Sequence, residues 1–269
     1  MPPAVKEPIF IFYHVCAIHH YASVVTEQLT ALLYSGLLVH RDLMAVYCFV
    51  TGNTPDDVAN AKRLLTSFSP KIQIVAESLD TRTFERFTLE NIRPMVDEVR
   101  DEAGSENIRL LYIHSKGVSH TDPEKASNTT HWTRALNYHL IGRHEQCLAL
   151  LRHYDVVGAF YSPTPAPHFQ GNFWWTRMSY AKKLPERIGA GYLEPELNFL
   201  FQASPLWFNM ATVPSAVRDL YKDALTPHYY TSVDNEPPIV EVAVALAAAT
   251  ATRDESSAED EAGDEATAS

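Results

Sequence analysis

Residues 8–37 read PIFIFYHVCAIHHYASVVTEQLTALLYSGL, and this stretch decides the fold class. Residues 8–15 are a short apolar run rich in β-branched and aromatic side chains, which predicts a buried strand. Between residues 21 and 37 the apolar positions 25, 29, 32 and 33 recur at helical spacing, and Gly36 is typical of a helix C-terminus. A strand is therefore followed directly by a helix.

The same alternation continues along the chain. Further strands are predicted at residues 43–50, 71–78, 108–114 and 154–160. Helices are predicted from Pro55 with Thr54 as the N-cap, over most of 84–103, and over 131–152. This order predicts an α/β fold with a mainly parallel sheet and helices on both faces. Such sheets bind ligands beyond the carboxyl ends of their strands, so polar residues just after strands are the first candidates for a site.

Charge and composition separate the C-terminal segment from the rest. The chain has 269 residues, 46% of them hydrophobic, and a net charge of −11. Residues 234–269 hold ten acidic residues against Arg253 alone, so about −9 of that charge lies there. We expect one domain over residues 1–235 and a disordered, acidic, Ala-rich tail over 236–269. The nearly neutral domain argues against nucleic-acid binding.

Several other classes of protein are disfavoured by what the sequence lacks. The three cysteines are widely spaced, which predicts no disulfide framework. The N-terminal apolar run is too short for a signal peptide, and no later stretch is long enough for a transmembrane segment, so a cytoplasmic location is expected. The sequence contains no GxGxxG, P-loop or GxSxG motif, which argues against the common dinucleotide, P-loop and hydrolase sites.

The stretch LLYIHSKGVSH, residues 110–120, places polar residues at the end of a strand. The imidazole of His114 could ligate a divalent ion, and the ammonium of Lys116 suits a phosphate oxygen. Gly117 permits close approach of a ligand to the backbone. Together they predict a diphosphate site, although a strand-end histidine bonded to backbone beside an exposed lysine would read the same way.

The polar segment 117–130 that follows has the length of a mobile lid. We expect Thr129 or Thr130 to cap the helix that begins near residue 131. Arg134 would then lie in its first turn and could point toward an anionic ligand, or could be an ordinary surface arginine.

The stretch SPTPAPHFQGNFWW, residues 162–175, joins a stiff proline-rich segment to polar and aromatic residues. His168 would be held with little conformational freedom, Gly171 permits close approach, and Asn172 could hydrogen-bond sugar hydroxyls. In an extended segment Trp174 and Trp175 face opposite sides, so one could lie in the core while the other lines a pocket. The alternative is that both indoles belong to the core.

The stretch GAGYLEPELNFLF, residues 189–201, predicts a helix start with Pro195 in its first turn. Glu194 or Glu196 could take a proton from an acceptor hydroxyl as a general base. The alternative is that both carboxylates only stabilise the helix end.

Five stretches occur in an order and at a spacing that resemble a family of small nucleotide-sugar glycosyltransferases. They are YIHSKGVS (112–119), HW..AL (131–136), YDVVGAF (154–160), PHFQGNFWW (167–175) and YLEPELNF (192–199). This family includes the N-terminal glycosyltransferase domain of large algal viruses and bacterial and algal relatives. The resemblance extends over residues 8–212, and the GNFWW block is its most specific part.

The resemblance implies a GT-A fold and transfer of a hexose or deoxyhexose, with inversion, from a nucleotide-diphosphate sugar, UDP-linked in the first instance, to a glycan or other hydroxyl acceptor. It also implies a manganese or magnesium ion. The Asp-x-Asp motif of most GT-A enzymes is absent from the predicted domain, so the need for a metal stays open.

The roles that follow from this resemblance can be given residue by residue. Catalysis is expected from Glu196 as base, with Lys116 and His114 stabilising the departing diphosphate. The nucleotide and diphosphate would be bound by Tyr13, His14, Thr51, Glu85, Lys116, Gly117 and Arg134. The sugar would be bound by His168, Gly171, Asn172, Trp174 and Trp175, and a metal by His114 and His168.

Two other functions compete with glycosyl transfer. A non-catalytic carbohydrate-binding protein would use Trp174 and Trp175 as a stacking platform and would need no diphosphate site. A glycoside hydrolase would need two carboxylates facing each other across a sugar. Glu194 and Glu196 are two positions apart and point in different directions on one helix, which disfavours this reading.

Overall fold

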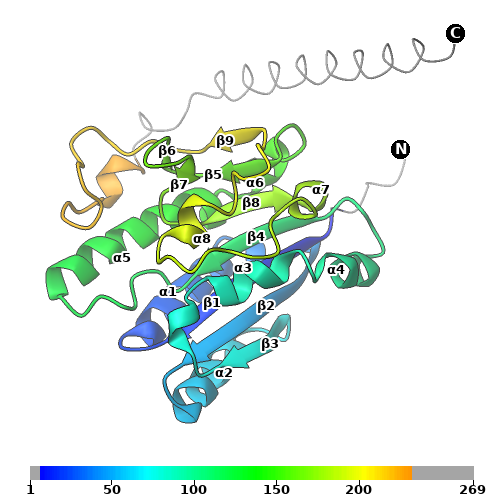
Figure 1. The fold of residues 1–269 in the computed structure, drawn as a ribbon, viewed down its shortest axis with the longest axis horizontal. Helices are drawn as coiled ribbons and strands as arrows, with labels where there is room; N and C mark the ends of the chain where they lie inside the picture. Colours follow the sequence, from blue (N-terminus) through cyan, green and yellow to red (C-terminus); the bar gives the residue numbers. More distant parts are fainter. Residues whose placement is uncertain (1–6, 232–269) are drawn as a thin grey trace, which may run out of the picture.

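A mostly parallel seven-stranded sheet organises the protein, as the computed structural model, which describes residues 7–231, shows in Figure 1. Its order is β3-β2-β1-β4-β8-β5-β9. The strands are β1 (Ile9–Ala17), β2 (Leu43–Gly52), β3 (Ile72–Ser78), β4 (Arg109–His114), β5 (Val156–Gly158), β8 (Trp174–Arg177) and β9 (Trp207–Asn209). The pairs β1–β2, β2–β3, β1–β4 and β5–β9 are parallel, and β8 runs antiparallel to both β4 and β5. β6 (Tyr161–Ser162) and β7 (His168–Phe169) form a separate two-stranded ribbon.

Helices cover both faces of the sheet (Figure 1). The helices are α1 (Tyr21–Tyr34), α2 (Pro55–Phe68), α3 (Arg86–Ile92), α4 (Val96–Ala103), α5 (Pro123–Asn137), α6 (His144–Leu150), α7 (Met178–Ala181) and α8 (Glu194–Leu197). Shorter helical turns are η1 (Leu37–Val39), η2 (Thr81–Thr83), η3 (Tyr138–Gly142) and η4 (Pro227–Tyr229). The α/β class and the single domain predicted from the sequence are confirmed for the described residues.

The interior strand β1 is covered on both faces, which explains why its sequence is apolar apart from His14 near its carboxyl end. Ile9, Ile11 and Tyr13 pack with the helices on one face, while Phe10 and Phe12 pack on the other. All of its residues are buried. Because side chains alternate along a strand, a sheet covered on both sides selects apolar residues at every position.

The helix expected over most of 84–103 is interrupted, so that prediction is wrong in detail. α3 ends at Ile92 and α4 begins at Val96. Pro94 lies between them, and proline has no backbone N–H to donate and clashes with the preceding turn. The break leaves α3 as a short element directly below the carboxyl ends of the strands.

The helix expected over 131–152 also differs, because it begins earlier and is divided. Asp122 caps α5 by accepting from the backbone N–H of Lys125 at 2.8 Å, and Pro123 occupies the first turn. Thr129 and Thr130, expected as caps, lie inside the helix, where their hydroxyls donate to backbone carbonyls one turn earlier. The segment expected as a lid over 117–130 is therefore largely helical.

The two adjacent tryptophans of β8 lie on opposite faces of the sheet and are both fully buried. Trp174 Nε1 donates to Asn172 Oδ1 at 2.9 Å. Trp175 Nε1 donates to the backbone carbonyl of Leu140 at 2.7 Å, within the π-helical turn η3 between α5 and α6. Each indole thus has a hydrogen-bond partner inside the core, as a buried N–H requires.

Two predictions about the ends of the chain meet the limits of the described residues. The acidic tail expected over 236–269 lies outside them. Within 7–231, none of the helices combines the length and the apolar character needed to cross a bilayer.

Candidate functional site

A cleft lies at the carboxyl ends of β1 and β4, where the parallel topology predicts a ligand site. Its volume is about 950 Å³, part of it open to solvent. Six of the residues expected to contact substrate line it, namely His14, Glu85, His114, Lys116, Gly117 and Glu196. These residues come from four separate segments of the chain that the sheet brings together.

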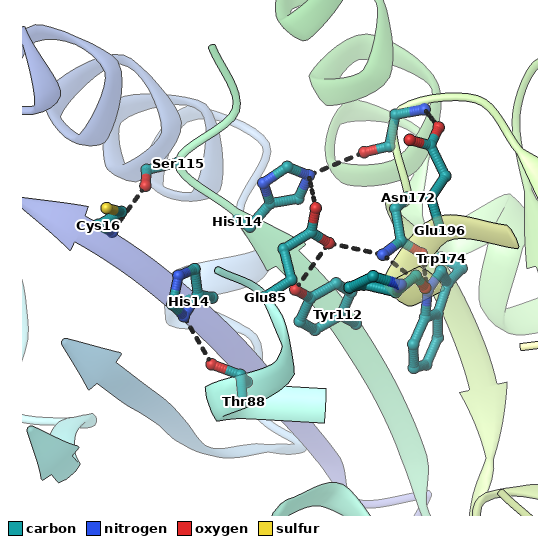
Figure 2. A network of polar contacts seen from close by, with 12 residues as sticks. His14, Cys16, Glu85, Thr88, Tyr112, His114, Ser115, Asn172, Trp174 and Glu196 are labelled. Carbon is teal, nitrogen blue, oxygen red and sulfur yellow. Dashed lines mark hydrogen bonds and ion pairs between the residues drawn. The ribbon is translucent and has the colours of Figure 1, made fainter. Parts of the chain in front are cut away.

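Glu85 is the centre of a hydrogen-bond network in this cleft (Figure 2). Its Oε2 accepts from Asn172 Nδ2 at 2.5 Å and from the Tyr112 hydroxyl at 3.1 Å. Only 19% of its side chain is exposed. Burial, followed by the nearby charge of Glu196, raises the pKa of Glu85 from 4.5 to about 7. Glu85 therefore exchanges a proton near neutral pH.

The backbone of Gly171 holds two other side chains of the cleft in place. His114 Nε2 lies 2.9 Å from the Gly171 carbonyl, which can only accept, so this nitrogen carries the hydrogen. The Gly171 N–H in turn donates to Glu196 Oε1 at 2.7 Å. Burial, then the charge of Lys116, lowers the pKa of His114 well below its usual value, so the ring is neutral with a lone pair on Nδ1.

Gly171 has a conformation and surroundings that suit only glycine. Its φ is +92°, and an added Cβ would lie 2.6 Å from Leu136 Cδ1 and 3.1 Å from Trp132 Nε1. A side chain at this position would therefore collide with α5 as well as strain the backbone. The tight packing fixes the peptide that orients His114 and Glu196.

His14 lies in the same cleft with an unused nitrogen. Its Nδ1 is 3.0 Å from the Thr88 hydroxyl, while its buried Nε2 has no hydrogen-bond partner among the described residues. Burial lowers the pKa of His14 to about 3, so the ring is neutral at physiological pH. The Nε2 atom is free to bond a ligand.

Lys116 is the buried cation among the described residues that line the cleft, which also include the exposed Arg82. The residue is 8% exposed, and its Nζ lies 3.8 Å from the centroid of the Trp132 ring. This cation–π contact holds the ammonium without neutralising it. Within residues 7–231, no carboxylate lies within ion-pair distance of Lys116.

The cleft is also lined by apolar and aromatic side chains. Phe84, Tyr192, Leu193 and Tyr221 all line the cleft, and the rings of Phe84 and Tyr192 meet edge to face at 5.0 Å. Phe84 has a φ of +48°, an uncommon conformation for an aromatic residue. The apolar and aromatic side chains give the cleft the combination of apolar and convergent polar groups that is typical of small-molecule sites.

Other residues expected at the site lie outside the cleft lining. The hydroxyl of Tyr13 donates to Gln28 at 2.6 Å, and Thr51 is fully buried. Arg134 was expected in a first helical turn near the ligand, but it lies in the last turn of α5, where it pairs with Glu27 at 2.7 Å. These side chains stabilise the domain around the cleft.

The residues expected to bind sugar are also displaced from the cleft surface. His168 Nδ1 bonds the carbonyl of Ala166 at 2.7 Å. The prediction that one tryptophan lines a pocket is wrong, because Trp174 and Trp175 are both fully buried. Gly171 and Asn172 do not line the cleft but hydrogen-bond side chains that do. The backbone of Gly171 bonds His114 and Glu196, and the side chain of Asn172 bonds Glu85.

Several residues of the cleft were not identified from the sequence. Tyr221 lies beyond the segments that resemble the glycosyltransferase family, Phe84 was given no role, and Tyr192 begins the stretch YLEPELNF but was given no role in the site. Cys16 follows His14 in β1, and its backbone N–H donates to Ser115 Oγ at 2.9 Å, which joins the ends of β1 and β4. The one available signal was position in the chain, because some of these residues follow a strand and ligands bind beyond the carboxyl ends of parallel strands.

The cleft does not offer a preassembled metal site. Within residues 7–231, the one group of three ligating atoms lying close together is His40, His144 and Glu145, which are not part of the cleft. Of the expected metal pair, His114 lines the cleft and His168 does not.

The structure is that of an α/β protein with a cleft at the carboxyl edge of a mostly parallel sheet. The chain belongs to the family DUF8361, described as a domain of unknown function, whose profile matches residues 12–187. That match begins within β1 and extends past β8, so it includes His14, Glu85, His114 and Lys116 but not Glu196. No curated protein matches the chain in sequence.

Proposed function

We propose that the protein is a GT-A-type glycosyltransferase that transfers a hexose or deoxyhexose from a nucleotide-diphosphate sugar, UDP-linked in the first instance, to a hydroxyl acceptor. The observation that supports this most strongly is the buried Lys116 ammonium beside two neutral imidazoles at the ends of β1 and β4. The sequence resemblance supports it independently.

Lys116 is suited to the leaving group. A departing nucleoside diphosphate gains negative charge, and a fixed cation in a largely buried site stabilises that charge more strongly than water does. Because Lys116 is held by a ring and not by a carboxylate, its charge is available to an anion. His114 Nδ1 adds a lone pair that can accept a hydrogen bond from a ribose or sugar hydroxyl, and His14 Nε2 is a second ring nitrogen that can accept or donate according to the tautomer of the ring.

Glu196 is suited to the acceptor. One of its oxygens accepts from Gly171 N–H, which leaves the other for a hydroxyl of the acceptor. In an inverting displacement this carboxylate would take the hydroxyl proton as the new glycosidic bond forms and the bond to diphosphate breaks. The charge of Glu196 contributes to raising the pKa of the neighbouring Glu85 to about 7.

A panel of nucleotide sugars tests this proposal. Purified protein is incubated with each donor, with and without Mn²⁺, while release of the nucleoside diphosphate and the thermal unfolding midpoint are measured. A transferase will release diphosphate from at least one donor and be stabilised by its product nucleotide. Absence of both effects for every donor would contradict the proposal.

One observation favours a second candidate, a glycoside hydrolase. Two carboxylates, Glu85 and Glu196, line the same cleft, and the pKa of one is raised to about 7. Retaining and inverting hydrolases use such a pair, in which the carboxyl group with the raised pKa acts as the general acid. The sequence pointed instead to Glu194 and Glu196, and did not reveal Glu85 as the partner.

Nitrophenyl glycosides separate the two functions, because they need no nucleotide site. A hydrolase will cleave one of them and will not respond to UDP. A transferase will leave them intact and bind UDP. The fully buried indoles remove the stacking platform on which a purely carbohydrate-binding function was based.

A further inference from the structure

A second cluster of ligating side chains lies at the amino edge of the sheet, away from the cleft. His40 stands between η1 and β2, while His144 and Glu145 begin α6. Each contributes one ligating atom, and these three atoms all lie within 4.8 Å of one another. The cluster joins two segments that are more than a hundred residues apart.

The distances within the cluster match those of a tetrahedral zinc site. Glu145 Oε1 lies 3.4 Å from His40 Nε2 and 3.6 Å from His144 Nε2. Ligands bound to zinc at about 2.0–2.1 Å and at the tetrahedral angle are about 3.3 Å apart. Two of the three ligand–ligand distances therefore already suit a bound zinc ion, and the two imidazole nitrogens lie within 4.8 Å of each other.

The hydrogen bonds of His144 prepare it as a ligand. Its Nδ1 lies 3.0 Å from the carbonyl of Ile141, which can only accept, so the hydrogen is on Nδ1 and the lone pair is on Nε2. A backbone carbonyl in this position is the usual support of a metal-bound histidine. The ring is also buried, and it meets the His40 ring edge to face at 5.9 Å.

His40 requires one exchange of hydrogen bonds. Its Nδ1 accepts from the backbone N–H of Asp42 at 3.1 Å, so in the metal-free protein the hydrogen is on Nε2 and faces Glu145. A cation bound to Nε2 would shift that hydrogen to Nδ1 and release the Asp42 amide to water. Occupation of the site is thus coupled to the turn that begins β2.

The cluster is open to solvent on one side. The side chain of Glu145 is 74% exposed, and that of His40 is 19% exposed. Both residues line a hollow that also contains Asp42 and Glu7. A cation can therefore enter without local unfolding, and a water molecule can take the fourth position.

We propose that His40, His144 and Glu145 bind a divalent transition-metal ion of the zinc class, with water as fourth ligand. Two imidazoles favour zinc over magnesium or calcium, which prefer oxygen ligands alone. The bound ion would tie the turn before β2 to the start of α6. The proposal is independent of the function proposed for the cleft.

The test uses the full chain without a polyhistidine tag, freed of metal by EDTA. Zn²⁺ is titrated by calorimetry, and Co²⁺ is added separately to record its visible absorption. We expect one equivalent of Zn²⁺ to bind and Co²⁺ to give the intense bands of tetrahedral coordination. Absence of binding, or only weak bands typical of six water-like ligands, would overturn the proposal.

Glu145→Gln identifies the site, and Glu186→Gln, another exposed carboxylate, is its matched control. We expect Glu145→Gln and His40→Gln each to weaken Zn²⁺ binding at least tenfold, while Glu186→Gln leaves it unchanged. Equal affinity in all three variants would contradict the assignment. So would loss of Zn²⁺ binding in His114→Gln, which would place the ion in the cleft.

Discussion

The side-chain amide of Asn172 donates a hydrogen bond of 2.5 Å to Glu85, which lies 87 positions earlier in the chain. The carbonyl of the same amide accepts from Trp174 Nε1, which fixes the orientation of the amide group. A buried indole thus positions a carboxyl in the cleft through one asparagine. This relationship explains why a Gly-Asn step precedes two tryptophans.

Asn172→Ala should lower the free energy of unfolding by about 2–4 kcal/mol, because it leaves the Trp174 N–H and one Glu85 bond without a partner. Urea denaturation measures the change. Asn172 has a φ of +54°, so Asn172→Gly serves as control for backbone strain. If the glycine variant were as stable as the original protein, the network would contribute nothing.

Gly171→Ala should be clearly more destabilising than Gly36→Ala, although both glycines have positive φ angles. An alanine Cβ meets nothing within 4 Å at position 36, so strain of about 1–2 kcal/mol is expected there. At position 171 it collides with Leu136, which adds about 1–3 kcal/mol. Equal losses in the two variants, measured by urea denaturation, would show that the contact with α5 is not tight.

Glu85 should make stability fall as the pH rises from 4.5 to 7. In this window the folded protein holds a proton that the unfolded chain, with a carboxyl pKa of 4.5, has already released. The loss in the free energy of unfolding that Glu85 causes is complete above pH 7 and amounts to at most about 3 kcal/mol. Glu85→Gln removes it, so the variant should gain stability relative to the original protein between pH 4.5 and pH 8.

The difference between the two unfolding free energies is the quantity to measure, because it removes the contribution of His14 and leaves that of Glu85 together with its contact to His114, whose Nε2 lies 3.6 Å from Glu85 Oε1. Those histidines have lowered pKa values, so their contribution to stability is lost as the pH falls below 6.5. Glu186→Gln, which changes an exposed carboxylate outside the cleft, is the control substitution. A Glu85→Gln difference that does not change with pH would refute the raised pKa.

Lys116→Met should reduce turnover of the nucleotide sugar about a hundredfold, since it removes the cation expected to stabilise the leaving diphosphate and keeps the apolar stem. Steady-state release of the nucleoside diphosphate measures this. Lys182→Met is the matched control, because Lys182 is exposed and pairs with Glu106 at 2.9 Å. Similar rates in the two variants would remove Lys116 from the mechanism.

The sequence was a good guide to the sheet and to one half of the cleft. Strands buried on both faces are continuous apolar runs, so β1, β2 and β4 could be recognised, and with them His14, His114 and Lys116 at their ends. The Thr54 cap of α2 was also correct, as its capping box with Asp57 confirms. Local sequence patterns are sufficient to predict a residue's role when that role depends only on the helix or strand that contains the residue.

The rest depends on contacts between distant segments. Glu85 becomes a central carboxyl only because Asn172 and Tyr112 reach it, and no local pattern records that meeting. The tryptophans were expected near sugar because aromatic and polar residues stood together, but β8 pairs with β4 and β5 inside the sheet, and both indoles are buried there. The start of α5 at Asp122-Pro123 carried a clear signal that was outweighed by the polar character of 117–130.

Calorimetric titration with UDP tests the account most directly, because a nucleoside diphosphate needs the Lys116 end of the cleft and no acceptor. We expect UDP to bind the original protein and Lys182→Met equally, and to bind Lys116→Met at least tenfold more weakly. Failure of UDP and of the other nucleoside diphosphates to bind, or equal binding to all three proteins, would contradict a diphosphate site at the ends of β1 and β4.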